Sequence, residues 1–254
     1  MANTLCVVHF PFRPPDTTLH SVPLNVRRFA GSSLLEWIVR RVGDAQQVDQ
    51  IVVVIRETEA ASSVMKLLPQ DITVFTSQAT DSLGQLADVV RNHSVDSIVR
   101  VSADTPFVDP ELIDRLLVTA QAHAACDYIG FSLSDGQPAI RSPIGVFADW
   151  FRAQAVLDAD QQATSYQDRS DVTRFMCGHP ECFQLRLLPV PRELDRQDLR
   201  LTVDSGEDWD HILEIFDALG PESLDSQQIA GLLDRQPGML ERMAHLNRSH
   251  TQIH

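Results

Sequence analysis

The sequence predicts an α/β fold in which helices cover both faces of a doubly wound, mostly parallel β-sheet. Three observations lead to this prediction. The chain has 254 residues, 43% of them hydrophobic, which is enough to bury a large core. Short runs of β-branched residues alternate with amphipathic helical patterns over the first two-thirds of the chain. One such run, Ile51–Ile55, is apolar throughout, as expected of a strand buried on both faces.

The alternation is clearest before residue 133. A strand over Leu5–Phe10 is followed by a loop and by an amphipathic helix over Leu34–Val42, for which Gly31-Ser32-Ser33 offers an N-cap. Asp109 and Pro110 indicate the start of a later helix, as N-cap and first helical residue. The other elements expected in this part are a helix at about Glu57–Leu68, a strand over Ile72–Phe75, a helix over Asp81–Asn92, and strands over Ser97–Val101 and Tyr128–Ser132.

The pattern is looser after residue 132, where Gly, Pro, Ser and Asp are frequent up to residue 145. We expect a single domain over residues 1–254, with a substrate or dimer insert over 133–190 and C-terminal helices over 206–250. The elements expected here are helices over Phe147–Leu157 and Asp168–Met176, strands over Cys182–Val190 and Leu199–Val203, and helices over Trp209–Leu219, Gln227–Asp234 and Met239–Asn247.

The charge of the chain limits its partners. It has 35 acidic and 21 basic residues, for a net charge of −14. A surface this negative repels nucleic acid and anionic lipid, so we expect neither nucleic-acid nor membrane binding. The exception is the N-terminal region, where residues 1–41 hold five arginines against two acidic residues. Twenty basic residues are arginine, and Lys66 is the only lysine.

No segment has the run of about 20 apolar residues that a membrane span requires, and the N-terminus lacks the features of a signal peptide. Four cysteines in a chain of this length do not form a disulfide framework. We therefore expect a cytoplasmic protein with reduced thiols. Cys177 and Cys182 lie close to His179, but no second Cys or His pair follows at a spacing suited to structural zinc.

Two aspartates come directly after predicted strands. Asp104 follows Ser97–Val101, and Asp204 follows Leu199–Val203. In open α/β sheets, ligands bind at the carboxyl ends of the strands. Two carboxylates that meet there suit Mg²⁺, which keeps several waters and takes one or two protein carboxylates together with phosphate oxygens. The alternative is that each aspartate is an ordinary cap or turn residue.

The common phosphate-binding motifs are absent. The sequence has no G-x-x-x-x-G-K-[ST] loop, no G-x-G-x-x-G after the first strand, and no G-x-S-x-G elbow. The first strand is followed instead by a long loop, from His9 to Gly31, that contains Arg13, Arg27 and Arg28. This loop is either an anion-binding feature or a solvated surface loop.

Four segments carry a family resemblance. Residues 99–114, VRVSADTPFVDPELID, resemble the R-x-T-G-D-x-P-L-x-D-P-x-x-I-D stretch of SpsF-like cytidylyltransferases, which are related to the CMP-sialate and CMP-Kdo synthetases. Residues 199–208, LRLTVDSGED, match the L-R-x-T-V-D-x-x-E-D motif of that family, and 169–173, RSDVT, resemble its R-E-H-V-T. Residues 223–247 are similar to its closing helices.

The resemblance implies a nucleotide-diphospho-sugar transferase-like fold, CTP as nucleotide donor, an acidic sugar or similar acceptor, and a role in surface polysaccharide biosynthesis. It also implies Mg²⁺ held by Asp104 and Asp204. The other residues that it places at the site are His9, Arg13, Asn25, Asp81 and Ala103 for the nucleotide, Arg13 and Arg27 for catalysis, and Arg141 and Arg169 for the acceptor. Related synthetases also suggest a homodimer.

The loop after the first strand departs from the family pattern. Where relatives have L-P-x-K, this chain has Val-Pro-Leu followed by Asn25, so the phosphate-binding lysine is missing. Arg13, Arg27 or Arg28 are candidates to replace it, since a guanidinium binds phosphate well. Two alternatives remain open: a non-catalytic relative that binds a nucleotide or sugar, and a glycosyltransferase. For the latter, residues 158–160 are a literal Asp-x-Asp match.

Overall fold

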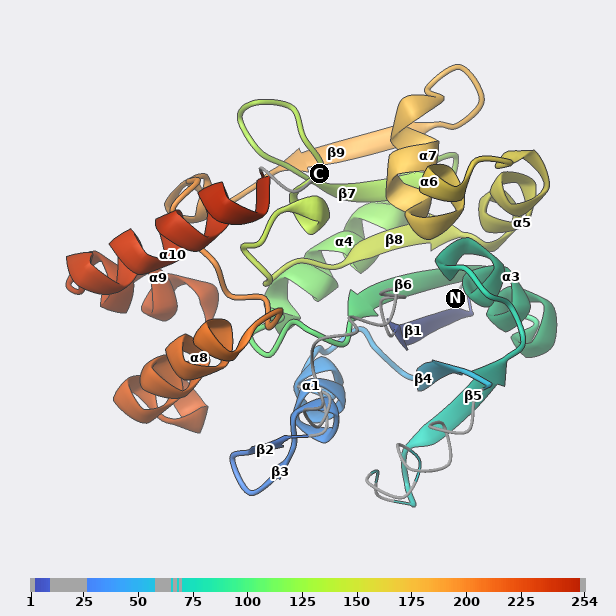
Figure 1. Ribbon diagram of the computed structural model, residues 1–254. Helices are drawn as coiled ribbons and strands as arrows, with labels where there is room; N and C mark the ends of the chain where they lie inside the picture. Colours follow the sequence, from blue (N-terminus) through green and yellow to red (C-terminus); the bar gives the residue numbers. More distant parts are fainter. Residues whose placement is uncertain (1–2, 10–26, 58–64, 66–67, 69, 252–254) are drawn as a thin grey trace.

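The computed structural model describes residues 3–9, 27–57, 65, 68 and 70–251. Within this part of the chain, seven strands form one sheet in the order β5-β4-β1-β6-β8-β7-β9 (Figure 1). The strands are β1 (Thr4–His9), β4 (Ile51–Arg56), β5 (Thr73–Ser77), β6 (Ser97–Ser102), β7 (Tyr128–Ser132), β8 (Asp149–Arg152) and β9 (Leu185–Pro189). A separate hairpin pairs β2 (Arg28–Phe29) with β3 (Ser32–Ser33).

The sheet is mostly parallel and doubly wound, which confirms the predicted fold class. Strands β1, β4, β5 and β6 are parallel, and β8 alone runs antiparallel to its neighbours β6 and β7. From β1 the chain proceeds to β4 and β5 on one side, and then returns to β6 on the other side of β1. The order of strands therefore reverses between β1 and β6, which is where ligands bind in such sheets.

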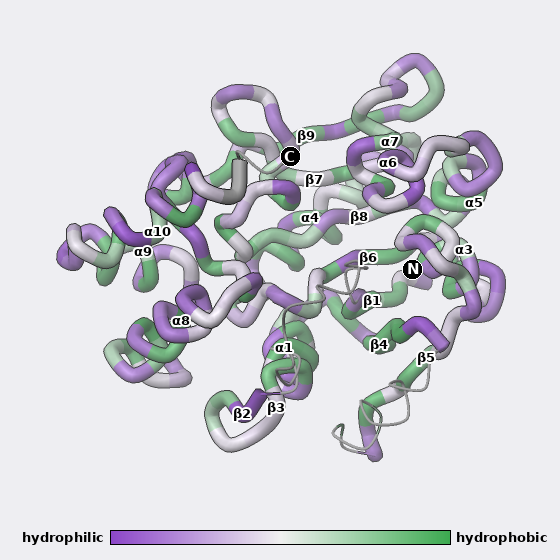
Figure 2. Tube along the Cα trace, viewed as in Figure 1, coloured by the Kyte–Doolittle hydropathy of each residue, from purple (hydrophilic) through white to green (hydrophobic). Residues whose placement is uncertain are grey.

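Helices pack against both faces of the sheet (Figure 1). One core combines alternate strand residues with α1, α4, α8, α9 and α10, and the other combines the remaining strand residues with α3, α5 and α7. Figure 2 shows hydrophobic residues along the central strands β1 and β4. The helix bounds are α1 (Leu34–Gly43), α3 (Ser82–His93), α4 (Pro110–Ala122), α5 (Ala153–Gln162), α6 (Tyr166–Ser170), α7 (Val172–Gly178), α8 (Gly206–Leu219), α9 (Ser226–Asp234) and α10 (Pro237–Thr251).

The expected N-caps of two helices are confirmed. The Ser33 side chain accepts a hydrogen bond from the Glu36 amide at the start of α1, and the Asp109 side chain accepts one from Glu111 at the start of α4. Each side-chain oxygen binds an amide that has no partner within its helix, so these residues set where the helices begin.

Three predicted elements differ from the structure. The helix expected over Phe147–Leu157 is strand β8 followed by α5, because residues 149–152 pair with both β6 and β7. The strand expected over Leu199–Val203 is an irregular segment outside the sheet. The helix expected over Asp168–Met176 is divided into α6 and α7, because Asp171 has an extended backbone and caps α7.

The helix expected at about Glu57–Leu68 falls largely outside the described residues. Among the helices that the structure does describe, none combines the length and apolar character that crossing a membrane requires.

Candidate active site

The point of strand reversal brings the ends of β1 and β6 together. His9, the last residue of β1, pairs in register with Ser102, the last residue of β6. The chain continues from β6 with Ala103, whose amide donates to the carbonyl of His9 at 3.0 Å. Asp104 is the next residue, where the chain has left the sheet at the edge where ligands are expected to bind.

Asp204 lies beside Asp104 although its segment is not a strand. The Val203 amide donates to the Asp104 carbonyl at 2.8 Å, which joins the two segments one residue before Asp204. Gly145 allows the same segment to pass close by. Its φ is +68°, and a Cβ atom there would lie 2.8 Å from the carbonyl carbon of Leu201. The predicted juxtaposition of the two aspartates is therefore present at the backbone.

Charged and hydroxyl groups surround the Asp204 carboxylate. Arg200 Nη2 donates to Asp204 Oδ2 at 2.9 Å, and Thr202 Oγ1 donates to the same oxygen at 3.1 Å. Arg200 also binds the buried Asp208 through two hydrogen bonds of 2.6 and 3.1 Å. Burial alone would raise the pKa of Asp208, but the hydrogen bonds and charge of Arg200 hold that pKa below its ordinary value.

The donor set of Asp104 and Asp204 fits Mg²⁺. Both side chains are partly exposed, both offer carboxylate oxygens, and they come from two adjoining segments. Mg²⁺ binds through one or two carboxylates while keeping water, so two are sufficient. Within the described ranges, no cluster of three or more His, Cys, Asp or Glu residues could hold a metal by itself. A cation here would therefore need phosphate or water oxygens as additional ligands.

His9 is buried beside this edge and does not carry a charge at neutral pH. Its Nε2 lies 2.7 Å from Gln85 Oε1. Gln85 Nε2 donates to the Ala79 carbonyl at 3.3 Å, which orients the amide so that Oε1 faces His9. The proton of His9 is therefore on Nε2. Burial lowers the pKa of His9 to about 4, the Gln85 hydrogen bond opposes this change, and the charge of Arg100 adds to it.

Asp81 and Arg169 form an ion pair next to Gln85. Asp81 Oδ1 caps α3 by accepting from the Gly84 amide at 2.9 Å, and its Oδ2 accepts from Arg169 Nε at 3.1 Å. Arg169 Nη2 donates to Asp160 Oδ1 at 2.8 Å, and its Nη1 donates to the carbonyls of Asp160 and Ala163. The guanidinium thus connects α6, α5 and the start of α3. Its predicted role in acceptor binding stays a prediction.

Arg27 lies against the first turn of α8. Its guanidinium carbon is 5.7 Å from the centre of the Trp209 ring, in the first turn of α8. This places a cation near the segment that begins at Asp204. Arg13 and Asn25, the other predicted phosphate-loop residues, lie outside the described residues.

Arg141 forms a partly exposed ion pair with Asp171, at 2.8 Å. Asp171 is also the N-cap of α7, where its Oδ1 accepts from the Arg174 amide at 3.1 Å. The pair thus ties the segment after β7 to the start of α7. The predicted acceptor-binding role of Arg141 stays a prediction.

Three residues that support the site were not predicted from the sequence. Gln85 lies four residues after Asp81, and this i, i+4 spacing on α3 would have placed both side chains on one helix face. Arg200 and Asp208 belong to the motif that identified Asp204, but their pairing depends on how α8 leaves the preceding segment. Asp158 and Asp160, the Asp-x-Asp match considered for a glycosyltransferase, lie inside α5, where Asp160 pairs with Arg91 and Arg169. This match is therefore a helix surface bound by arginines.

Comparisons with known sequences match most of the chain. The model of the family described as "MobA-like NTP transferase domain" matches residues 25–206, a range that includes both aspartates. The curated protein "Spore coat polysaccharide biosynthesis protein SpsF" of Bacillus subtilis (strain 168) is 25% identical over 224 residues, which are 85% of this chain and 90% of SpsF.

Solved structures share the fold at lower identity. A cytidylyltransferase from Leptospira borgpetersenii has a TM-score of 0.78 at 15% identity, covering 94% of this chain and 97% of that one. CMP:2-keto-3-deoxy-manno-octonic acid synthetase, complexed with CTP, has a TM-score of 0.62 at 11% identity, covering 85% and 99%. Rv0371c of Mycobacterium tuberculosis H37Rv, in complex with manganese, has a TM-score of 0.58 at 19% identity, covering 84% and 98%.

These findings confirm the resemblance that the motifs predicted. The family match includes β6, Asp104 and Asp204. Because the family model matches well over half of its residues, and SpsF is similar over 85% of its length, the chain belongs to the MobA-like NTP transferase domain family.

Proposed function

We propose that this protein transfers CMP from CTP to an acidic sugar or similar acceptor, releases pyrophosphate, and serves surface polysaccharide biosynthesis. The observation that carries the proposal is the contact between the segments of Asp104 and Asp204 at the strand reversal. The names of SpsF and of two structural neighbours, a cytidylyltransferase and a synthetase complexed with CTP, favour CTP over other triphosphates and a sugar as acceptor.

In this proposal, an oxygen of the acceptor attacks the α-phosphorus of CTP, the bond from that phosphorus to the β-phosphate oxygen breaks, and pyrophosphate leaves. Asp104 and Asp204 would hold Mg²⁺, which supplies positive charge to the phosphate oxygens when it is bound. The manganese complex of a structural neighbour supports a divalent cation in this fold. Arg27 binds the negative charge of the triphosphate from the side of α8.

In this proposal, the neutral His9 lies on the nucleotide side of the site. His9 stays uncharged at neutral pH, so it adds neither attraction nor repulsion for phosphate and instead holds α3 through Gln85.

On the acceptor side, Arg141 is a cation that would bind the carboxylate of an acidic sugar. Residues 133–190 contain Arg141 and Arg169 and form the acceptor side of the domain in this proposal.

The missing lysine favours one competing function. Asn25 replaces the phosphate-binding lysine of the family pattern, and the only lysine is Lys66. Losing a charge-assisted phosphate contact costs about 1.5–3 kcal/mol. A relative that binds CTP or a sugar nucleotide without turnover would tolerate that loss. Turnover and binding must therefore be measured separately.

The experiment tests each nucleoside triphosphate for binding, by thermal stabilisation, and for turnover, by pyrophosphate release with a panel of sugar acids. Both are measured with and without Mg²⁺. We expect stabilisation and pyrophosphate release with CTP that require Mg²⁺ and are lost in Asp104→Asn. Asp158→Asn is the matched control, because Asp158 lies on α5 and accepts from Gln154 of the same helix. Binding without pyrophosphate release would favour the non-catalytic function, and no binding would contradict both.

A further inference from the structure

Arg200 is a buried cation that contacts Asp204 but faces away from solvent. Its side chain is 3% exposed, whereas that of Asp204 is 20% exposed. Arg200 Nη2 and Thr202 Oγ1 both donate to Asp204 Oδ2, at 2.9 and 3.1 Å. Two donors on one oxygen hold a carboxylate in a single orientation.

Asp208 fixes Arg200 in this position. Its two carboxylate oxygens accept from Nε and Nη2 of Arg200, at 2.6 and 3.1 Å. Asp208 Oδ2 also accepts from the amides of Asp204 and Ser205, at 3.0 and 2.8 Å. The carboxylate therefore binds the guanidinium and the backbone of Asp204 at the same time, which makes the start of α8 one rigid unit.

The C-terminal helix α10 reaches the same unit through Asn247. Asn247 Nδ2 donates to the carbonyls of Gln197 and Leu199, at 2.9 and 3.0 Å. These two bonds orient the amide, so that Asn247 Oδ1 faces Arg200 Nη1 at 3.4 Å. A residue 43 positions after Asp204 thus supports the segment that carries it.

We propose that Arg200 is a positioning residue that orients the Asp204 carboxylate for a divalent cation, and that Asn247 of α10 supports Arg200 in this role. The inference rests on the proposed function, because it takes Asp204 as a metal ligand. It goes further by assigning a role to Arg200, Thr202 and Asn247, none of which would touch the cation or the substrate.

Charge and orientation have opposite effects on cation affinity, so the variants must separate them. Removing the positive charge of Arg200 would make the site more negative and would favour a cation. Losing the orientation of Asp204 would weaken cation binding, because partners that orient metal ligands typically contribute about 10–100-fold in affinity. Arg200→Lys keeps the charge but cannot bind Asp208 and Asp204 with a planar fork. Thr202→Val changes no charge and is nearly isosteric.

The test measures Mn²⁺ binding by calorimetry and by the Mn²⁺ paramagnetic resonance signal, without nucleotide. We expect Arg200→Lys to weaken binding by about 10–100-fold and Thr202→Val by about 10-fold. Arg196→Lys is the matched control. Arg196 also pairs with two aspartates, Asp198 and Asp234, but contacts neither Asp204 nor Arg200 in the described residues. We expect this variant to bind Mn²⁺ as the wild type does.

The outcomes separate this inference from the proposed function. If the wild-type protein binds no Mn²⁺ at millimolar concentrations, the metal site of the proposed function is wrong and the inference fails with it. If the wild type binds Mn²⁺ and Thr202→Val binds equally well, the inference alone is wrong. Should Arg200→Lys fail to fold, Thr202→Val and Asn247→Ala decide, since neither leaves a buried charge unpaired. We expect Asn247→Ala to weaken binding in the same direction as Thr202→Val.

Discussion

His9 shows how one buried side chain makes stability depend on pH. The folded protein holds it with a pKa of about 4, below its ordinary value of 6.5. His9 is neutral in both the folded and the unfolded protein above pH 6.5, so its burial costs no stability there. As pH falls from 6.5 toward 4, the unfolded protein binds a proton at His9 more readily than the folded protein, and the free energy of unfolding decreases. The shift corresponds to about 3 kcal/mol.

His9→Gln removes this titration while keeping a side chain that can bind Gln85. We expect the free energy of unfolding of the wild type to fall more steeply between pH 6.5 and 4 than that of the variant, by about 3 kcal/mol. Urea unfolding at several pH values measures the difference. Carboxylates that titrate in this range affect both proteins equally. Parallel curves for the two proteins would show that His9 is not buried in its neutral form.

At the residue scale, the sequence predicted single side chains better than their partners. Asp104 and Asp109 were predictable because strand ends and N-caps are local patterns. The pairing of His9 with Gln85, or of Arg200 with Asp208, depends on contacts between separate elements. No periodicity or spacing encodes such contacts, so these partners required the structure.

At the scale of elements, Arg169 connects three helices. It pairs with Asp81 at the start of α3 and with Asp160 on α5, and its side chain is only 26% exposed. We expect Arg169→Ala to lower the free energy of unfolding by about 1–3 kcal/mol, because two carboxylates lose their shared donor. Arg174→Ala is the control, since this arginine is 45% exposed and its ion pair with Asp168 should contribute less than about 1 kcal/mol.

The same variants separate structural support from acceptor binding by Arg169. A positioning role predicts that stability and CTP affinity fall together in Arg169→Ala, because α3 carries Gln85 and the Asp81 cap. A change in the KM of the acceptor with unchanged stability would instead support direct contact with the acceptor, as the sequence motif implied.

Helices and strands were predicted correctly where the local hydrophobic pattern determines them. The prediction failed where pairing with a distant strand determines the structure. Residues 147–157 contain apolar residues at spacings that suit a helix, yet residues 149–152 form β8, since they pair with strands on both sides. Residues 199–203 alternate like a strand, but the amides of residues 201–203 donate to the carbonyls of Pro143 and Asp104 rather than to a neighbouring strand. The segments of Asp104 and Asp204 adjoin through a backbone hydrogen bond, although the strand predicted before Asp204 is absent from the sheet.

At the scale of the whole molecule, Arg41 joins the C-terminal helices to the sheet domain. It is 9% exposed, and it donates to the carbonyl of Val108 before α4 and to that of Leu224 before α9. Residues of α8, α9 and α10 also share one hydrophobic core with α1 and α4. The C-terminal helices and the sheet should therefore unfold together.

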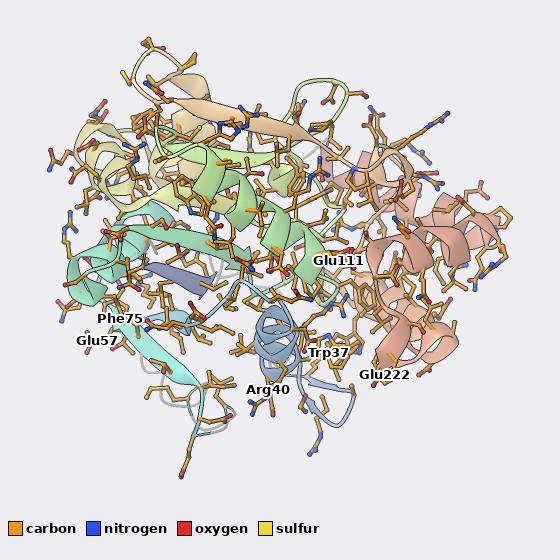
Figure 3. The ribbon with its side chains drawn as sticks, turned by 180° about the vertical axis from the view of Figure 1, so that it is seen from behind. Trp37, Arg40, Glu57, Phe75, Glu111 and Glu222 are labelled. Carbon is orange, nitrogen blue, oxygen red and sulfur yellow. The ribbon has the colours of Figure 1, made fainter. Side chains whose placement is uncertain are left out.

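We expect Arg41→Met to lower the free energy of unfolding by about 3 kcal/mol, because two buried carbonyls lose their donor. The neighbouring Arg40→Met is the control. Arg40 is 52% exposed, projects from α1 in Figure 3, and pairs with Asp71, so we expect a loss of less than about 1 kcal/mol. Urea unfolding followed by tryptophan fluorescence and by circular dichroism measures both. Two separate transitions in the wild type would contradict a shared core.

In the proposed function, the acidic character of the whole chain makes nucleotide binding depend on local cations. A net charge of −14 opposes the approach of a triphosphate, and in this proposal Arg27 and a divalent cation offset the repulsion locally. The central claim is therefore that Asp104 and Asp204 bind nucleotide through a divalent cation.

The most direct measurement is a calorimetric titration of CTP, with and without Mg²⁺, into the wild type, Asp104→Asn and the control Asp158→Asn. The account predicts that the wild type and Asp158→Asn bind CTP only with Mg²⁺, and that Asp104→Asn binds at least about 10-fold more weakly. Equal binding by all three proteins, or binding that does not depend on Mg²⁺, would contradict it.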